Sequence, residues 1–137
     1  MRCAAIFAAA VLSGCSSGII PLRPRATDVD TIEQKLALNP CVKTYEHWSR
    51  NYYFEAHPLD HRFLKFIQQY SYDVVRFEYY EEGGVRDLRS GRHVYTRNPL
   101  YGIYIDGHFR YAAGRYDLRS HLLVVDFCGW ADLPLSQ

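Results

Sequence analysis

The sequence predicts an α+β domain, in which N-terminal helices pack on one face of a C-terminal antiparallel β-sheet of about four strands. Two observations predict this class. Apolar residues recur at helical spacing up to about residue 70, and from Asp73 onwards they alternate with a period of two. The length of 137 residues suits a single domain with a buried core.

The first predicted helix spans residues 28–38. Asp28 or Asp30 is expected to cap it, because Asp30 and Glu33 stand at capping-box spacing. The residues that share one helical face, and are therefore expected in the core, are Val29, Ile32 and Leu36.

Two further helices are predicted before the sheet. Asn39 caps the second helix and Pro40 occupies its first helical position. A helical stripe that places Cys41 on the buried face is formed by Cys41, Tyr45, Trp48 and Tyr52. The third helix is predicted over residues 58–70, with inward positions at Leu59, Phe63, Phe66, Ile67 and Tyr70.

The first predicted strand follows Asp73. Its apolar face consists of Val75, Phe77 and Tyr79, and its polar face of Arg76 and Glu78. The chain is expected to turn at Glu82-Gly83-Gly84. Residues 85–98 are poorly patterned, with a short strand expected around residues 93–96.

The strongest hairpin signal is Asp106-Gly107, inside residues 101–111. A two-residue type I′ turn there would set three pairs of residues opposite one another: Ile105 with His108, Tyr104 with Phe109, and Gly102 with Tyr111. The last strand is predicted over residues 120–128. Its continuous apolar run at residues 122–125 indicates that both of its faces are covered.

The start of the chain carries a targeting signal. Arg2 supplies a positive charge, residues 4–12 form an uncharged apolar stretch, and Gly14 is a small residue before a thiol. The segment Leu12-Ser13-Gly14-Cys15 resembles the lipobox of bacterial lipoprotein precursors. The resemblance implies that residues 1–14 are a signal peptide, that Cys15 carries diacylglycerol, and that the acylated chain is held in a lipid bilayer. Ser16 after the cysteine implies sorting to the outer membrane, facing the periplasm.

Two other interpretations of this segment agree less well with its residues. A transmembrane helix needs about 20 consecutive apolar residues, and this run is roughly half as long. An ordinary secretory signal cleaved near residues 8–10 would leave Cys15 without an evident use.

Residues 15–27 are predicted to be a lipidated start and a flexible tether, and residues 28–137 a single domain. A tether of this length spans at most about 40 Å, so it favours partners at the same membrane. The formal charge of +1 falls to zero when Arg2 is removed. Nucleic-acid binding is not expected, because it needs a basic excess.

Export to an oxidising compartment allows the pairing of the cysteines to be predicted. With Cys3 in the signal peptide and Cys15 lipidated, Cys41 and Cys128 remain in an oxidising compartment, where a disulfide between them would persist. The alternative is two separately buried thiols. A metal site is not expected, because these two cysteines lack the close spacing of such sites.

No enzyme, cofactor or metal signature is recognised. His57, Asp60 and His61 cluster, but His57 precedes Pro58 and leaves the helical face, so a helix start is the preferred interpretation. His93, His108 and His121 are scattered over the sheet, where packing roles are expected. Nucleophile, Walker and dinucleotide motifs are absent. The chain is therefore predicted to be a non-enzyme.

The arginine and tyrosine residues indicate a role in protein binding, since both residue types are enriched at protein interfaces. The residues of interest alternate along the predicted hairpin: Arg110, Tyr111, Arg115, Tyr116 and Arg119. They form either a contact surface or cross-strand cation-π packing on a solvated face.

Two functional classes follow. The preferred class is a membrane-anchored periplasmic lipoprotein that serves as an accessory or interaction component of a cell-envelope complex. The alternative is an inhibitor or immunity-type lipoprotein that blocks a periplasmic hydrolase, for which the arginine-rich residues 86–97 would be the charged loop. The sequence does not specify the partner or the oligomeric state.

Overall fold

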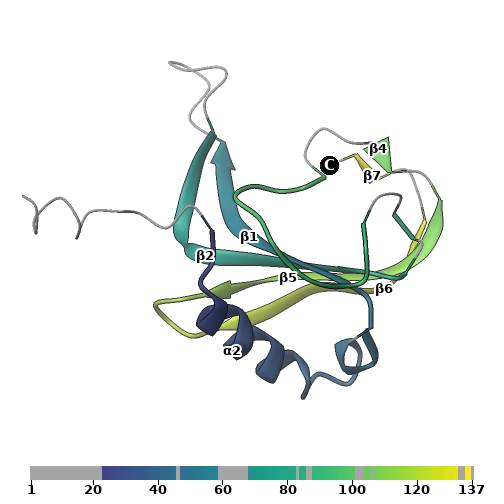
Figure 1. The fold of residues 1–137 in the computed structure, drawn as a ribbon, viewed down its shortest axis with the longest axis horizontal. Helices are drawn as coiled ribbons and strands as arrows, with labels where there is room; N and C mark the ends of the chain where they lie inside the picture. The colour runs from purple at the N-terminus through teal and green to yellow at the C-terminus, as the bar shows by residue number, and fades with distance from the viewer. Residues whose placement is uncertain are drawn as a thin grey trace, which may run out of the picture.

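The computed structural model describes residues 23–45, 47–58, 68–82, 84–85, 88–100, 104–105, 107–132 and 135–136. A five-stranded mixed sheet dominates it, with one α-helix on one face (Figure 1). The α+β class is confirmed. The elements before the second strand are α2 (Ala26–Leu36), the 3-10 helix η1 (Val42–Tyr45) and β1 (Ser49–Pro58). The later strands are β2 (Gln68–Tyr80), β3 (Gly91–Val94), β4 (Tyr104–Ile105), β5 (His108–Asp117), β6 (Leu123–Asp132) and β7 (Leu135–Ser136).

The large sheet has the strand order β3-β1-β2-β5-β6. Three of its pairings are antiparallel, and β3 runs parallel to β1, so the expected purely antiparallel sheet of about four strands is wrong. The end of β2 at Tyr80 and the start of β3 at Gly91 both lie beside Ser49 of β1, so β3 runs opposite to β2 and therefore parallel to β1. Strands β4 and β7 form a separate two-stranded sheet.

Helix α2 covers one face of the sheet through the three residues that the helical spacing predicted. Val29, Ile32 and Leu36 are buried. They belong to a core in which the inward strand residues include Tyr52, Phe54, Val75, Phe77, Tyr79, Ala112 and Tyr116. The predicted alternation of β2 is confirmed, because its apolar residues face this core.

The opposite face has its own, smaller core. After β2 the chain turns at residues 81–84, where the amide of Gly84 donates to the carbonyl of Glu81. The segment that follows runs across the sheet (Figure 1). Its buried residues Val85 and Leu100 pack with Tyr80 and Phe109. Among the described residues, one face of the sheet thus packs against α2, and the other packs against Val85 and Leu100, which precede and follow β3 in the sequence.

The start of α2 differs from the expectation. The helix begins at Ala26, inside the predicted tether, and Arg25 at its N-cap makes no side-chain cap hydrogen bond. The capping box of Asp30 and Glu33 does not form. Their spacing instead aligns both carboxylates on one side of the helix, where they bind Arg92.

The predicted second helix is wrong except for its start. The Asn39 side chain accepts hydrogen bonds from the amides of Cys41 and Val42, at 2.9 and 3.1 Å, as a cap would. Only the single turn η1 follows, and β1 begins at Ser49. Tyr52 and Phe54 face the α2 core while Tyr53 is buried on the other face. Burial on both faces and the strand propensity of aromatic residues favour the strand.

The predicted third helix is also contradicted where it is described. Residues 59–67 lie outside the described residues, but Pro58 ends β1 and Gln68 begins β2. Tyr70 therefore lies in a strand and pairs with Ala56.

The predicted hairpin and last strand pair differently from the expectation. Tyr104 and Ile105 pair with β7 and not with β5. Gly102 lies outside the described residues, and Tyr111 has Gly129 as its partner. The prediction that both faces of β6 are covered is wrong, because Phe127 on one face and Trp130 on the other are exposed. The strand is also the terminal one of the sheet. Its apolar run reflects strand propensity more than burial, since Leu123, Val124 and Val125 are only half-buried.

Candidate interaction surface

The outer strand β6 displays large apolar side chains. Trp130 is 55% exposed, Phe127 is 36% exposed, and Leu122, which directly precedes the strand, is 60% exposed. We call these three residues and the outer backbone of β6 the β6 edge surface. Within the described residues, no strand pairs with this edge.

The backbone of Trp130 points to the outside of the sheet. The amide of Arg110 donates to the Glu81 carboxylate, and its carbonyl accepts from the Glu81 amide, both at 3.1 Å. Both groups of Arg110 therefore point toward β2 and away from its register partner Trp130. In an antiparallel pair, a residue pair that does not exchange hydrogen bonds directs both sets of backbone groups outwards. The N–H and C=O of Trp130 thus lie on the open edge.

A stack of cations and rings fixes Trp130 from one side of the sheet. The Arg110 guanidinium lies 5.3 Å from the centroid of the Trp48 ring and 5.5 Å from that of Trp130. His108 stacks on Trp130 at 4.5 Å, and Arg110 also donates to Glu81 at 3.1 Å. Hydrogen bonds from the Arg110 backbone amide and guanidinium lower the pKa of Glu81. This stack of cations and rings holds the exposed indole of Trp130 in one orientation.

A second aromatic row crosses the opposite face. Tyr111 stacks on Phe127 at 4.5 Å and on Tyr80 at 5.8 Å. Tyr111 lies opposite Gly129, whose φ of 152° is one that side chains rarely adopt. The aromatic atom next to the open side of Gly129 is Cζ of Phe127, 4.0 Å from the place that a Cβ would take, so Phe127 gives this glycine the kind of cover that the sequence predicted at Gly102. Phe127 ends this row at the sheet edge.

The five predicted contact residues do not share one surface. Arg110 and Tyr116 lie on the α2 side of β5, whereas Tyr111 and Arg115 lie on the other, because strand side chains alternate. Tyr116 is buried and contacts His121 at 3.1 Å. Arg115 lies 3.8 Å from Asp126, and Arg119, in the turn after β5, pairs with Asp73 at 2.9 Å. A partner-binding role for these residues stays a prediction, and Arg110 shows the alternative cation-π packing.

Sequence reasoning missed Phe127 and Trp130 as surface residues. The last strand was expected to end at Cys128, so Trp130 fell outside it. The signal that was available is the pair of large aromatic residues on either side of Gly129.

The expected cysteine pair is present. Cys41 and Cys128 are joined as a disulfide, with their Cα atoms 6.4 Å apart and a sequence separation of 87. The bridge ties the segment after α2 to the edge strand. Cys41 is exposed, whereas the predicted helical stripe had placed it on a buried face.

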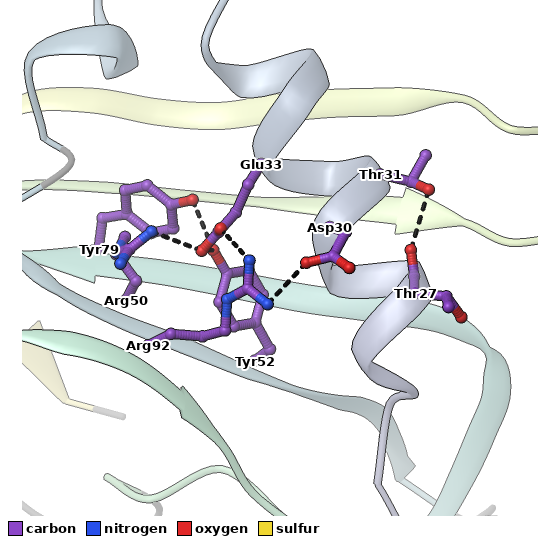
Figure 2. Close-up of polar contacts among 8 residues, drawn as sticks. All are labelled: Thr27, Asp30, Thr31, Glu33, Arg50, Tyr52, Tyr79 and Arg92. Atoms are coloured by element: carbon purple, nitrogen blue, oxygen red, sulfur yellow. Dashed lines mark hydrogen bonds and ion pairs between the residues drawn. The ribbon is translucent and has the colours of Figure 1, made fainter.

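A polar cluster joins α2 to the sheet (Figure 2). The Glu33 carboxylate accepts hydrogen bonds from Arg50 at 2.7 Å and from the Tyr52 hydroxyl at 2.8 Å. Arg92 of β3 donates to Glu33 and, at 2.7 Å, to Asp30. Burial raises the pKa of Tyr79, whose hydroxyl contacts that of Tyr52, to about 12.

A buried carboxyl lies on the opposite face of β2. Glu78 is 4% exposed and accepts hydrogen bonds from the hydroxyls of Tyr53 at 2.7 Å and Tyr80 at 3.0 Å. Burial raises the pKa of Glu78. The Asn51 amide donates to the Glu78 carbonyl at 3.2 Å, which adds a backbone contact to the network.

The histidines considered as catalytic or metal-binding groups do not converge in the described structure. His57 belongs to β1, while Asp60 and His61 lie outside the described residues. His108 begins β5, and His121 lies in the turn that follows it. Among the described residues, no group of three or more His, Cys, Asp or Glu side chains is arranged to hold a metal ion.

No known protein family, curated protein or solved structure matches this chain. In the part of the chain that the structure describes, no helix has the length and apolar character needed to span a membrane.

Proposed function

We propose that this protein is a lipid-anchored interaction protein of the bacterial cell envelope, held at the periplasmic face of the outer membrane by acylated Cys15. The single observation that favours an interaction role is the β6 edge surface. Exposed Trp and Phe side chains are typical of protein contact sites, because each buries a large area with few rotatable bonds.

The proposed mode of binding is addition of an extended strand of the partner to β6. Such binding takes its affinity from main-chain hydrogen bonds and its specificity from side chains on alternate faces. The outward N–H and C=O of Trp130 can form the main-chain hydrogen bonds. The side chains of Trp130 and Phe127, which lie on opposite faces, can form the specific contacts. Natural edge strands usually carry charges, prolines or bulges that prevent pairing. Strand β6 has a bulge at Asp126 and a charge at Asp132, and residues 127–131 between them contain no charge and no proline.

The alternative function, inhibition of a periplasmic hydrolase, finds less support. It was expected to use an arginine-rich protruding loop at residues 86–97. Residues 91–94 of that segment instead form β3, the strand at the other edge of the sheet, and Arg92 is bound to two carboxylates of α2.

The anchor is tested by replacing Cys15 with Ala and fractionating cells. We expect the variant to leave the membrane fraction, because the acyl chains supply the binding free energy. A variant that remains membrane-bound and uncleaved would show that the lipobox interpretation is wrong.

The interaction role is tested by copurification from detergent-solubilised envelopes. We expect Trp130→Ser and Phe127→Ser each to lose a partner that the unaltered protein retains. Leu38→Ser is the matched control, because Leu38 is an equally apolar residue, 85% exposed, on a different part of the molecule. Equal loss in all three variants would contradict the proposal.

A further inference from the structure

The two edges of the large sheet differ in how readily they accept another strand. Strand β3, at one edge, has four residues, and its Arg92 side chain is bound to Asp30 and Glu33 of α2. Strand β6, at the other edge, has ten residues and directs the N–H and C=O of Trp130 outwards. A short edge strand that carries a charge resists pairing. In the described part of the chain, β6 is therefore the edge that favours pairing.

The uncharged run at residues 127–131 restricts the register in which two identical β6 strands could pair. In an antiparallel pair, the residues that exchange hydrogen bonds must both direct their backbone groups to the shared edge. Two symmetric registers then centre on this run, one with Trp130 opposite itself and one with Gly129 opposite itself. The Gly129 register sets the acidic positions 126 and 132 opposite each other, which is unfavourable, whereas the Trp130 register does not.

The Trp130 register gives two identical strands both main-chain and side-chain contacts. Trp130 and the partner's Trp130 exchange two N–H···O=C hydrogen bonds, with their Cα atoms about 5.5 Å apart. Their indoles then lie on the same face as a cross-strand aromatic pair, which is one of the stabilising pairs of antiparallel sheets. Each indole is 55% exposed in the single chain, so the pair buries apolar surface that is otherwise in contact with water.

The same pairing is compatible with two anchors in one membrane. Trp130 lies opposite Arg110, which shares a face of β5 with Ala112, a residue of the core beneath α2. Because paired residues in an antiparallel sheet direct their side chains to the same face, the two copies place their α2 helices on the same face of the joined sheet. The tether proposed before α2 is therefore attached on that face in both copies.

We propose that the partner strand at β6 is a second copy of this chain, paired antiparallel with Trp130 opposite the partner's Trp130, so that two sheets join into one. This inference names the partner of the β6 edge surface and therefore rests on the proposed function. A two-fold pair uses the β6 edge of both copies, so the assembly closes as a dimer and does not grow into a fibre.

Charge substitutions at position 130 test this register, because the residue faces its own copy there. The full chain, purified in detergent, is expected to dimerise with a Kd on the order of 100 µM or lower, as for a small interface. Trp130→Lys and Trp130→Glu each set like charges opposite each other, so each variant alone should associate at least about ten-fold more weakly. An equimolar mixture of the two brings an ammonium group opposite a carboxylate and should regain the dimer. Sedimentation, and native mass spectrometry with one variant labelled with a heavy isotope, measure the association.

Leu38→Lys and Leu38→Glu are the matched controls, because Leu38 is 85% exposed elsewhere on the molecule. They should leave dimerisation unchanged, alone and mixed. A photoreactive phenylalanine derivative at position 130, which adds no charge, gives a second measurement. It should crosslink to residues 128–132 of an isotope-labelled, unaltered copy.

Loss of the dimer in each charged variant and its recovery in the mixture would support self-pairing. An unaltered chain that stays monomeric, variants that dimerise as well as it does, or a mixture that regains nothing would each overturn it. Self-pairing fails alone if the purified chain is monomeric while Trp130→Ser loses a different envelope protein on copurification. The proposed interaction role fails with it if no partner of either kind depends on position 130.

Discussion

Glu33 links three elements of the fold through one carboxylate. It accepts hydrogen bonds from Arg50 and Tyr52 of β1 and from Arg92 of β3, and it belongs to α2. Removing one member of a partly buried charged network lowers the stability of the fold, because the remaining donors stay desolvated and have lost their acceptor. Asp30 is a weaker contributor, since its side chain is half-exposed.

We therefore expect Glu33→Ala to lower the free energy of unfolding by about 3 kcal/mol, within the range for breaking a partly buried charged network. Asp30→Ala, the control at the same arginine, should cost under about 1 kcal/mol. Urea denaturation measures both values. Equal losses in the two variants would contradict the role given to Glu33.

Glu78 makes stability depend on pH in a direction that can be worked out. Burial raises its pKa in the folded state above the ordinary value of 4.5. Between the unfolded and folded pKa values the native state holds the proton and the unfolded state does not, so stability falls as pH rises through this window. Ionised Glu78 is stabilised in part by the hydroxyls of Tyr53 and Tyr80.

We expect Glu78→Gln to remove this fall in stability above the ordinary carboxyl pKa and to be as stable as the unaltered protein, or more so, at pH 7. Glutamine stays uncharged, and its amide group retains one strong acceptor. Urea denaturation from acid to neutral pH compares the two proteins. An unchanged pH dependence in the variant would show that Glu78 is not its source.

At the scale of elements, sequence patterns predicted the structure where one face of an element is buried. The core residues of α2, the alternation of β2 and the cap at Asn39 were predicted from local spacing. The second helix was mispredicted because Cys41, Tyr45, Trp48 and Tyr52 satisfy a helical period, although the aromatic run at residues 52–54 is buried on both faces of a strand. Local spacing does not distinguish these two forms of burial.

Local sequence patterns do not predict which distant strands pair with each other. Asp106-Gly107 has the composition of a tight turn, yet Tyr104 pairs with Ser136. The edge position of β6, on which the candidate interaction surface depends, is likewise set by which strands pair and not by its own apolar run. The charge pairs of Arg92 were missed for the same reason.

The disulfide connects two elements that the hydrogen bonds of the sheet do not join. It closes a loop across a sequence separation of 87 residues. In the chain-entropy account, closing such a loop contributes about 4.6 kcal/mol. We expect Cys41→Ser with Cys128→Ser to lower the free energy of unfolding by about this amount, as measured by urea denaturation. Two reactive thiols in the native exported protein would contradict the bridge.

At the scale of the whole molecule, the proposed anchor and the β6 edge surface lie at different places in the chain. The proposed tether precedes α2, which lies on one face of the sheet, while β6 forms one lateral edge. A domain held within about 40 Å of a membrane by its tether would present this edge to partners at the same membrane. The central claim is that β6 is the site where such a partner binds.

Site-specific photocrosslinking in intact cells tests this claim most directly. A photoreactive phenylalanine derivative at position 130 keeps an aromatic ring at the edge, and the same group at position 38 reports on an exposed site elsewhere. We predict a discrete crosslinked partner from position 130 that is absent from position 38. Crosslinks from position 38 alone, or the same products from both positions, would contradict the assignment of β6 as the binding edge.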